Sequence, residues 1–309
     1  MVYPWYFKAA LQKMLTGLPG HRAMQHLVQR HVLGSFRLSE DYVADRLAHV
    51  ARHLDAWQVW RPWPLPGHVL EIGTGWCPLV PLGLYLCGID HITSSDLGDW
   101  VERAPLRRVG AVLHETAAGH LPRLRPDRLA TLDRLAADAD PRRALAGLGI
   151  DLVRTTRGAL PPGPFDLILS NNTLEHIPAR ELPPLIAAML RALSPQGLMS
   201  HYIDMADHYS YGDPRISPLH FLRYSPRQWA WLENSLQSQN RLRASQYRHL
   251  FAQAGWHLLA ETAEQADPAD LHRQPLAAAF AGLHPDDLRT TYTHQVWARD
   301  ESRKILPQP

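Results

Sequence analysis

The sequence is poor in cysteine and has no long apolar run. Its 309 residues include 2 cysteines, Cys77 and Cys87, which are too few for a four-ligand zinc site of cysteines or a disulfide framework. We therefore expect a reducing compartment, most simply the cytoplasm. No stretch reaches the roughly 20 apolar residues that a membrane-spanning helix needs, and residues 1–18 lack the apolar segment of a secretory signal peptide. We expect no membrane partner.

A strong charge of either sign is also missing. The formal net charge is +2, and no basic stripe interrupts the sequence, so we expect no nucleic-acid partner. Hydrophobic residues make up 45% of the chain and charged residues 20%, which is typical of a globular chain with a sizeable core. A small molecule is the expected partner, and the sequence leaves a homodimer open.

The chain divides at a proline-rich linker. Apolar residues recur at helical spacing before it, and Ser39 is expected to cap a helix there. Residues 61–67 carry three prolines at alternate positions, which cannot continue a helix. We predict an N-terminal helical extension or lid over residues 1–64 and an α/β domain over residues 65–309. Residues 205–240 form a predicted insertion on the substrate side of this domain.

Short apolar strands alternate with helices after the linker. The strands are expected at residues 68–72, 91–95, 150–153, 165–170, 197–203, 256–261 and 290–298, and the main helices at 79–86, 181–193 and 241–254. Such alternation favours a Rossmann-like, doubly wound and mostly parallel sheet with helices on both faces.

A glycine-containing turn follows the first strand. Gly73 and Gly75 lack a Cβ, so the chain can turn sharply and a ligand can approach the backbone. Ligands of such folds bind at the carboxyl ends of the strands. Asp96 ends the next strand, 25 positions after Glu71, which suits a carboxylate that binds the two hydroxyls of a ribose.

Three ordered segments resemble one enzyme family. Glu-x-Gly-x-Gly at 71–75 resembles motif I of the class I S-adenosylmethionine-dependent methyltransferases. Residues 165–177 resemble its motif IV with a Leu-Glu-His-Ile continuation, and residues 193–197 resemble the turn before its fifth strand. The resemblance covers residues 65–205 and implies a seven-stranded sheet whose last strand is antiparallel. Residues 71–78 resemble a subgroup found in bacterial biosynthetic or surface-polysaccharide gene clusters.

The resemblance also implies a cofactor and the residues that bind it. The cofactor is S-adenosylmethionine. The residues expected to bind it are Glu71, Gly73, Thr74, Gly75, Asp96, Leu97 and Asn171. Thr155 and Thr156, after the third strand, are expected near the adenine.

Polar residues after the fourth and fifth strands are expected to handle the acceptor. His176, His208 and Asp207 are the predicted catalytic residues. An imidazole, whose unperturbed pKa is about 6.5, suits proton removal at neutral pH. The predicted substrate-binding residues are Asn172, His201, Tyr211, Arg215 and Arg223. The two arginines could clamp a carboxylate or phosphate. Surface ion pairing is the alternative for both.

Two further hypotheses concern a metal ion and a lid. His201, Asp204 and His208 have ligand chemistry, but side chains alternate along a strand, so His201 and Asp204 should point to opposite faces. We therefore expect no metal. The aromatic residues Tyr3, Trp5 and Tyr6 are expected either to cover the cofactor or simply to pack on the sheet.

The predicted reaction is methyl transfer to an oxygen or nitrogen of a small polar metabolite. One alternative is a nucleotide-dependent oxidoreductase, but Pro78 stands where a dinucleotide fingerprint has its third glycine. The other is a catalytically silent homologue that only binds the cofactor. The sequence itself does not choose among oxygen, nitrogen and sulfur acceptors.

Overall fold

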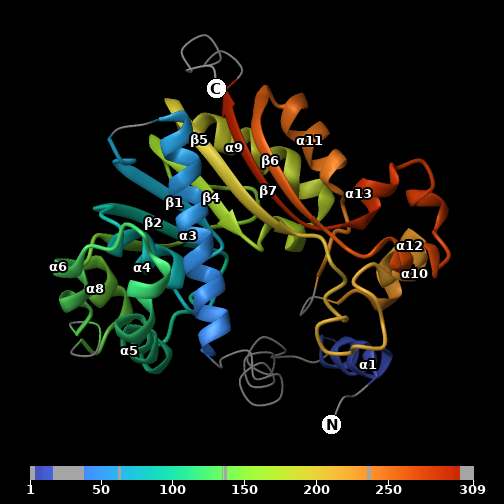
Figure 1. Ribbon diagram of the computed structural model, residues 1–309, viewed down its shortest axis with the longest axis horizontal. Coiled ribbons are helices and arrows are strands. Elements are labelled where there is room, and N and C mark those ends of the chain that lie inside the picture. Colours follow the sequence, from blue (N-terminus) through green and yellow to red (C-terminus); the bar gives the residue numbers. More distant parts are fainter. Residues whose placement is uncertain are drawn as a thin grey trace.

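A computed structural model describes residues 4–16, 38–61, 64–133, 135, 138–234 and 238–299. These residues form a seven-stranded sheet with helices on both faces (Figure 1). The strands are β1 (His68–Ile72), β2 (His91–Asp96), β3 (Ile150–Arg154), β4 (Phe165–Asn171), β5 (Leu193–Asp204), β6 (Trp256–Gln265) and β7 (Thr290–Arg299).

The sheet order is β3-β2-β1-β4-β5-β7-β6. Neighbouring strands from β3 to β5 pair in parallel, and β7 runs antiparallel to β5 and to β6. The predicted Rossmann-like fold is therefore confirmed, together with the antiparallel last strand. β5 begins at Leu193 rather than 197, because the predicted turn is an irregularity in the pairing of β5 with β4.

Helices α3 (Glu40–Trp60), α4 (Leu79–Leu86) and α5 (Arg103–His120) cover one face of the sheet. Ser39 caps α3 as predicted, because its hydroxyl accepts from the Tyr42 N–H. Val50 of α3 packs so closely on α4 that a Cβ on Gly83 would lie 2.9 Å from it. Shorter helices follow on this side: α6 (Pro126–Leu129), η1 (Ala130–Leu132) and α8 (Pro141–Ala146).

Helices α9 (Leu182–Ala192) and α11 (Ala244–Gln253) cover the opposite face, after the short turns η2 (Leu174–His176) and η3 (Ala179–Glu181). The helix predicted at 241–254 begins three residues late. Arg241 has a φ of 58°, which an α-helix excludes, and its guanidinium donates to the carbonyls of Phe221 and Tyr224. A tertiary contact thus overrides the helical pattern.

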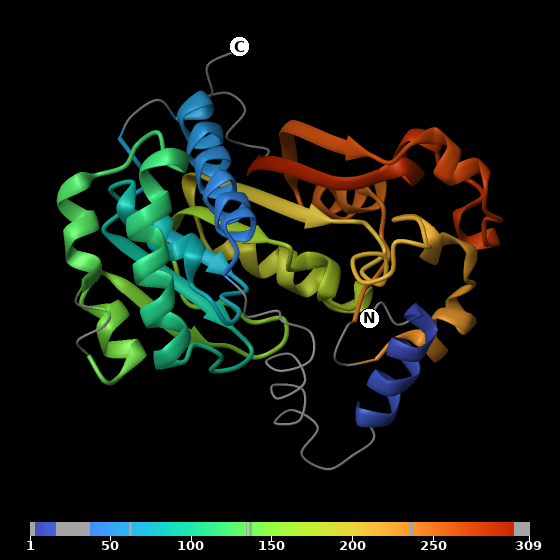
Figure 2. The same ribbon diagram turned by 60° about the horizontal axis from the view of Figure 1, so that its bottom comes forward.

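A third group of helices lies beyond the carboxyl end of β5 (Figure 2). It contains α1 (Trp5–Thr16), η4 (His220–Arg223), α10 (Pro226–Leu232), α12 (Pro268–His272), η5 (Ala278–Phe280) and α13 (Pro285–Arg289). Phe221, Trp229 and Phe280 form its separate apolar core. Lys13 of α1 donates to two carbonyls at the end of α10, Ala230 and Glu233. The division at residues 64 and 65 stays a prediction.

Candidate functional site

The carboxyl ends of four neighbouring strands open into one cavity. Its volume is about 1210 Å³, and its lining includes Asp96 of β2, Gly73 after β1, Asn171 of β4 and Asp204 of β5. Because the strand order is β2-β1-β4-β5, these residues follow one another along the sheet edge. Small-molecule sites commonly occupy roughly 300–1,000 Å³, so the cavity has room for two ligands side by side.

The turn after β1 is fixed by backbone hydrogen bonds. The Gly73 N–H donates to the Ser95 carbonyl at 2.7 Å, and the Gly75 N–H donates to Asp96 Oδ2 at 2.9 Å. Gly73 has a φ of 94°, and a Cβ there would lie 2.2 Å from Thr173 Oγ1. Glycine is therefore required at this position, and the turn brings Gly73 and Asp96 together at the cavity wall.

The carboxylate of Asp96 is held in place by hydrogen bonds from the Leu97, Gly98 and Gly75 N–H groups and from the Trp100 indole. Its Oδ1 accepts from the Leu97 N–H at 2.6 Å and the Trp100 indole N–H at 2.7 Å, while Oδ2 accepts from Gly75. A carboxylate has about four lone-pair positions, so Oδ2 keeps one for a ligand. Thr155 is next to it, because its N–H donates to the Asp96 carbonyl at 2.8 Å.

Three other predicted cofactor residues line the same end. Leu97 and Thr156 form part of the wall, and Thr74 bonds Ser94 through its hydroxyl at 2.7 Å. The Trp76 ring packs on Trp100 with 4.7 Å between centroids. The surface that they make is suited to a flat aromatic group beside a carboxylate.

Glu71 is a buried acid at the floor of the cavity. Its side chain is 3% exposed and accepts from the Ser94 hydroxyl at 2.5 Å. Burial, opposed by the Ser94 hydrogen bond and reinforced by the charge of Asp96, raises the pKa of Glu71 to about 8. An arriving cationic group would favour the ionised form, so this carboxyl suits a ligand that carries an ammonium.

A chain of buried polar groups orients Asn171. His53 of α3 lies 3.0 Å from Asn171 Oδ1 through Nε2 and 2.7 Å from the Ser200 hydroxyl through Nδ1, and His294 Nε2 lies 2.7 Å from the same hydroxyl. Burial lowers the pKa of His53 far below its usual value, so the ring is neutral and donates once. Among the described residues, Asn171 Nδ2 has no partner and lines the cavity.

Asp204 is the carboxylate at the β5 end. Its Oδ2 lies 3.1 Å from His208 Nε2 and accepts from the Tyr211 hydroxyl at 2.6 Å and from the Tyr292 hydroxyl at 3.2 Å. Burial opposes ionisation, but the hydrogen bonds and charge of His208 and the Tyr211 hydroxyl outweigh it and lower the pKa of Asp204. The residue is 3% exposed and faces the acceptor end of the cavity.

His176 faces His208 across this end, with 5.0 Å between the ring centroids. Its Nδ1 lies 2.7 Å from the Ser238 carbonyl. The side chain is exposed towards the open cavity, and desolvation by the surrounding protein and the neighbouring His208 lower the pKa of His176. The side chain lies on the short turn η2.

Asn172 and Tyr211 also line the cavity. Asn172 has a φ of 49°, its N–H donates to the Tyr202 carbonyl at 2.9 Å, and its Oδ1 is without a partner within the described part of the chain. The Tyr211 ring stacks on His208 with 5.6 Å between centroids. The acceptor end is therefore polar on several sides.

His201, predicted to bind substrate, is placed elsewhere. Its side chain is fully buried, lies 2.9 Å from the Ser170 hydroxyl through Nδ1 and packs on Phe251 of α11. Strand alternation turns it towards the helices on one face of the sheet. This placement corrects the expectation of a contact with the acceptor, because His201 does not line the cavity.

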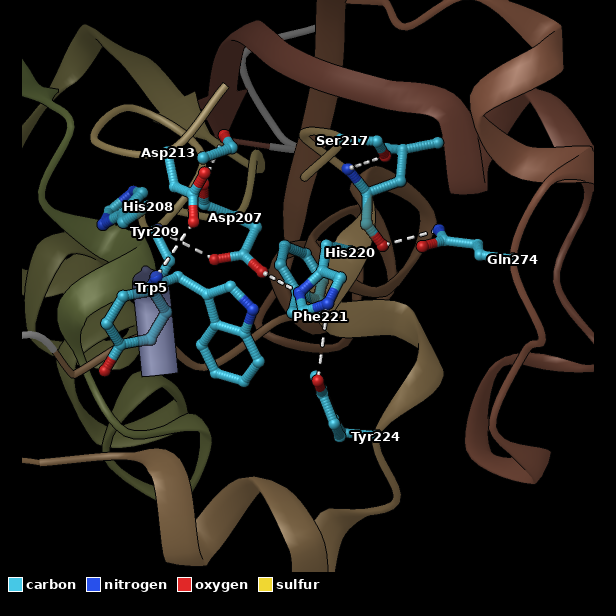
Figure 3. Close-up of polar contacts among 12 residues, drawn as sticks. Trp5, Asp207, His208, Tyr209, Asp213, Ser217, His220, Phe221, Tyr224 and Gln274 are labelled. Carbon is cyan, nitrogen blue, oxygen red and sulfur yellow. Dashed lines mark hydrogen bonds and ion pairs between the residues drawn. The ribbon is translucent and has the colours of Figure 1, made fainter. Parts of the chain in front are cut away.

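Asp207 is likewise turned away from the cavity. Figure 3 shows its carboxylate pointing to His220, above the indole of Trp5 in this view. The distance from Asp207 Oδ2 to His220 Nδ1 is 3.3 Å, and Oδ1 accepts from the Tyr209 N–H. Asp204 and Asp207 each begin a tight turn. In the resulting loop, His208 faces the cavity and Asp207 does not.

The two predicted arginines do not line the cavity either. Arg215 makes a two-point contact with Asp213, through Nε at 2.6 Å and Nη2 at 2.7 Å. The same Asp213 accepts from the Trp5 N–H at 2.9 Å. Arg223 lies against the Tyr224 ring. Ion pairing, the alternative left open for these arginines, agrees with the contact of Arg215 with Asp213.

The predicted aromatic lid is only partly described. Tyr3 lies outside the described residues. Trp5 packs on His220 and Tyr209, with centroids 4.9 and 5.7 Å apart, and Tyr6 is 61% exposed. These two side chains pack beside the 205–240 segment and not on the sheet.

Sequence reasoning missed four groups at the cavity: His53, Tyr42 and Arg46 of α3, and Glu175 of η2. Tyr42, Arg46 and Glu175 line it. The residues of α3 carry no motif, since a long helix before the first strand gives no sign of which turn reaches the site. Glu175 stands inside the Leu-Glu-His-Ile segment, so its signal was present.

Comparison with known proteins identifies the class. A family model described as a methyltransferase domain matches residues 62–261, more than half of the chain. The chain therefore belongs to this methyltransferase family and is a class I S-adenosylmethionine-dependent methyltransferase. The predicted enzyme class and cofactor are confirmed, and the oxidoreductase alternative is wrong. The biosynthetic subgroup stays a prediction.

Solved structures with similar folds include other methyltransferases. A TehB-like S-adenosylmethionine-dependent methyltransferase from Corynebacterium glutamicum is 13% identical, with 81% of this chain and 87% of that chain covered and a TM-score of 0.40. An S-adenosylmethionine-dependent methyltransferase from Mesorhizobium loti is 17% identical, with 75% of this chain and 90% of that chain covered and a TM-score of 0.39. Phosphoethanolamine N-methyltransferase 2 of Haemonchus contortus is 14% identical, with 80% of this chain and 52% of that chain covered and a TM-score of 0.43. No curated protein sequence matches the chain.

Within the described ranges, no helix combines the length and the apolar character that crossing a membrane requires.

Proposed function

We propose that this chain methylates an oxygen or nitrogen atom of a small polar molecule. The observation that carries the proposal is one continuous cavity, which joins the Gly73–Asp96 end to a polar end at β4 and β5. Direct transfer requires donor and acceptor to be aligned in one space from which water is excluded. A cavity of about 1210 Å³ with two chemically different ends can hold donor and acceptor side by side in one space.

The residues at the first end fit S-adenosylmethionine. Asp96 Oδ2 keeps an acceptor position for the ribose, and Glu71 and the unpartnered Asn171 amide suit the amino-acid part. When bound, this cofactor supplies a methyl group on a cationic sulfur, which the acceptor's lone pair takes while the carbon–sulfur electron pair stays on sulfur. Gly73, Thr74, Gly75 and Leu97 complete the proposed cofactor site.

The other end is proposed to bind the acceptor. Asn172, His176, His208 and Tyr211 offer both donors and acceptors of hydrogen bonds, and Asp204 adds a negative charge beside them. Such groups orient a hydroxyl or an amine, and the proton that an acceptor loses leaves towards this cluster. A polar metabolite also fits the biosynthetic setting that the resemblance at residues 71–78 suggests.

Calorimetry with S-adenosylmethionine and S-adenosylhomocysteine tests the cofactor site. We expect Asp96→Ala to weaken binding about 10-fold to 100-fold, because it removes a charged hydrogen-bond acceptor. Asp90→Ala is the matched control, since Asp90 precedes the opposite end of β2 and is exposed. Equal affinities of wild type and Asp96→Ala would show that the cofactor binds elsewhere.

Transfer of an isotope-labelled methyl group tests the acceptor class. Wild-type protein, labelled cofactor and a cell extract are incubated, and the extract is then separated by size. We expect the label in the small-molecule fraction. Label found only in protein or nucleic acid contradicts the proposed acceptor, and no transfer at all, with intact cofactor binding, favours a catalytically silent homologue.

A further inference from the structure

Glu175 has a buried carboxyl group without hydrogen-bond partners among the described residues. The side chain is 2% exposed, and among the described residues neither carboxyl oxygen has a hydrogen-bond partner. The N–H groups of Glu175 and Asp204 lie near it without completing a hydrogen bond of normal geometry. Burial and then the charge of Asp204 raise its pKa well above the usual value. Buried polar groups normally have partners, so the unpartnered state of this carboxyl needs an explanation.

Two imidazoles stand beside this carboxyl. One ring nitrogen of His176, one of His208 and an oxygen of Glu175 all lie within 4.8 Å of one another. His176 Nδ1 lies 2.7 Å from the Ser238 carbonyl, which can only accept, so Nδ1 carries the hydrogen and Nε2 keeps a lone pair. A metal-binding histidine typically donates its other ring N–H to a carbonyl or carboxylate in this way.

The surrounding charge also favours a cation. Asp204 Oδ2 is 3.1 Å from His208 Nε2, so a second carboxylate adjoins the three groups. Arg46 acts on Glu175 through its charge, but no hydrogen bond joins the two side chains. An ion between Glu175 and the imidazoles would offset the cost of ionising a buried acid.

We propose that Glu175, His176 and His208 bind a divalent first-row transition-metal ion at the acceptor end of the cavity. A set of two imidazoles and one carboxylate binds such ions in preference to magnesium or calcium. Three protein ligands leave coordination positions open for a substrate. The expectation of no metal was argued from His201, Asp204 and His208. That set shares only His208 with this site, and His201 is buried on another face.

The role of the ion deepens the proposed function and rests on it. The open positions would face the space that the acceptor must enter, so an acceptor oxygen could bind the ion. Coordination lowers the pKa of a bound hydroxyl, and the imidazoles would then serve as ligands and not as bases. Acceptors with two neighbouring oxygen atoms, which can chelate, are favoured. Metal binding itself does not depend on methyl transfer.

Titration of the full-length protein with Co²⁺ tests the proposal, after removal of metal by dialysis against a chelator. Visible absorption of bound Co²⁺ reports imidazole coordination. We expect wild type to bind Co²⁺ and Glu175→Gln and His208→Ala each to weaken binding at least about 10-fold. His249→Ala is the matched control, because His249 is exposed on α11; it should bind Co²⁺ like wild type.

Two results would overturn the site: wild type that produces no Co²⁺ absorption, or absorption that both variants keep unchanged. Glu175→Gln preserves side-chain shape, and circular dichroism verifies the fold of each variant; if one is unfolded, the other decides. Calorimetry with S-adenosylmethionine on the same samples separates the two proposals. Cofactor binding without Co²⁺ binding would contradict only the metal site. Co²⁺ binding without cofactor binding would contradict only the proposed function.

Discussion

The two ends of the cavity are built differently. At the cofactor end, hydrogen bonds from the backbone N–H groups of Gly73, Gly75 and Leu97 fix the geometry. At the acceptor end, side chains bond side chains that are distant in sequence, such as Tyr292 to Asp204. A backbone turn can be recognised in a short motif, whereas a cluster of side chains depends on how whole elements pack.

Each end also holds a buried acid, and the two acids differ. Glu71 accepts a hydrogen bond from Ser94, while Glu175 has no partner in the part of the chain that is described. Burial raises the pKa of both. The Ser94 hydroxyl thus already offers Glu71 one partner that favours its ionised form, and Glu175 is the group whose ionisation a bound ligand would change most.

The largest effect on ligand binding should come from breaking the backbone geometry of the cofactor end. In Gly73→Ala the new Cβ would meet Thr173 at 2.2 Å, with a φ of 94°. Left-handed backbone costs roughly 1–2 kcal/mol for other residues, and the clash adds to it. Calorimetry should show affinity for S-adenosylmethionine lowered at least about 100-fold.

Gly255→Ala separates strain from the site. Gly255 has a φ of 86° and nothing within 4 Å of an added Cβ, so this variant should lose about 1 kcal/mol of stability and keep its cofactor affinity. If Gly73→Ala binds as well as Gly255→Ala, the turn after β1 does not hold the cofactor.

The acceptor end should respond to Asp204 and not to Asp207. Asp204→Asn removes the charge beside His208, and we expect methyl transfer to slow about 10-fold to 100-fold with cofactor affinity kept. Asp207→Asn alters a buried contact with His220 outside the cavity, so transfer by the folded protein should change little. A larger loss in Asp207→Asn would restore the catalytic role expected from sequence. The measurement is the rate of label transfer to the extract.

Local signals explain which features the sequence predicts. Ser39 caps α3 through the N–H of Tyr42 three residues on, and the strand at 68–72 is an apolar run before a glycine turn. Both depend on neighbours in sequence. The resemblance to motif I adds Asp96, whose position follows from the next strand. These features place the cofactor end without knowledge of tertiary contacts.

Tertiary contacts explain what the sequence does not predict. His53 reaches Asn171 only because α3 packs across β4 and β5, and 118 positions separate the two residues. Asp207 and His208 are adjacent and equally polar, so only the turn geometry decides which faces the cavity. Glu175 lies in the recognisable Leu-Glu-His-Ile segment, but only the structure shows that its carboxyl is buried. The acceptor end therefore needs the structure.

A pH titration of stability should separate Glu71 from an ordinary acid. Burial raises its pKa from 4.5 to about 8, so the unfolded chain releases this proton before the folded chain does. Stability without ligand should fall as pH rises between these values and level off above about 8. Glu71→Gln should lack this decline and gain up to about 4 kcal/mol relative to wild type at pH 8.

Chemical denaturation at several pH values measures the difference between variant and wild type, because Glu175 contributes a decline of the same sign to both. Glu115→Gln, at an exposed position of α5, is the control and should run parallel to wild type. A Glu71→Gln curve that also parallels wild type would mean that Glu71 is solvated and not the buried acid of the cofactor end.

The smallest effect should come from the arginines of the 205–240 segment. Arg223 lies against Tyr224 and outside the cavity lining, so Arg223→Ala should change the rate of label transfer less than about twofold. Arg215→Ala removes a contact to Asp213, which also holds the Trp5 N–H, and should act on the packing of α1 only. Limited proteolysis reports the packing of α1, and the transfer assay reports catalysis. Both are run on the same samples of the two variants. A rise in the acceptor's KM in either variant would extend the acceptor end beyond the cavity.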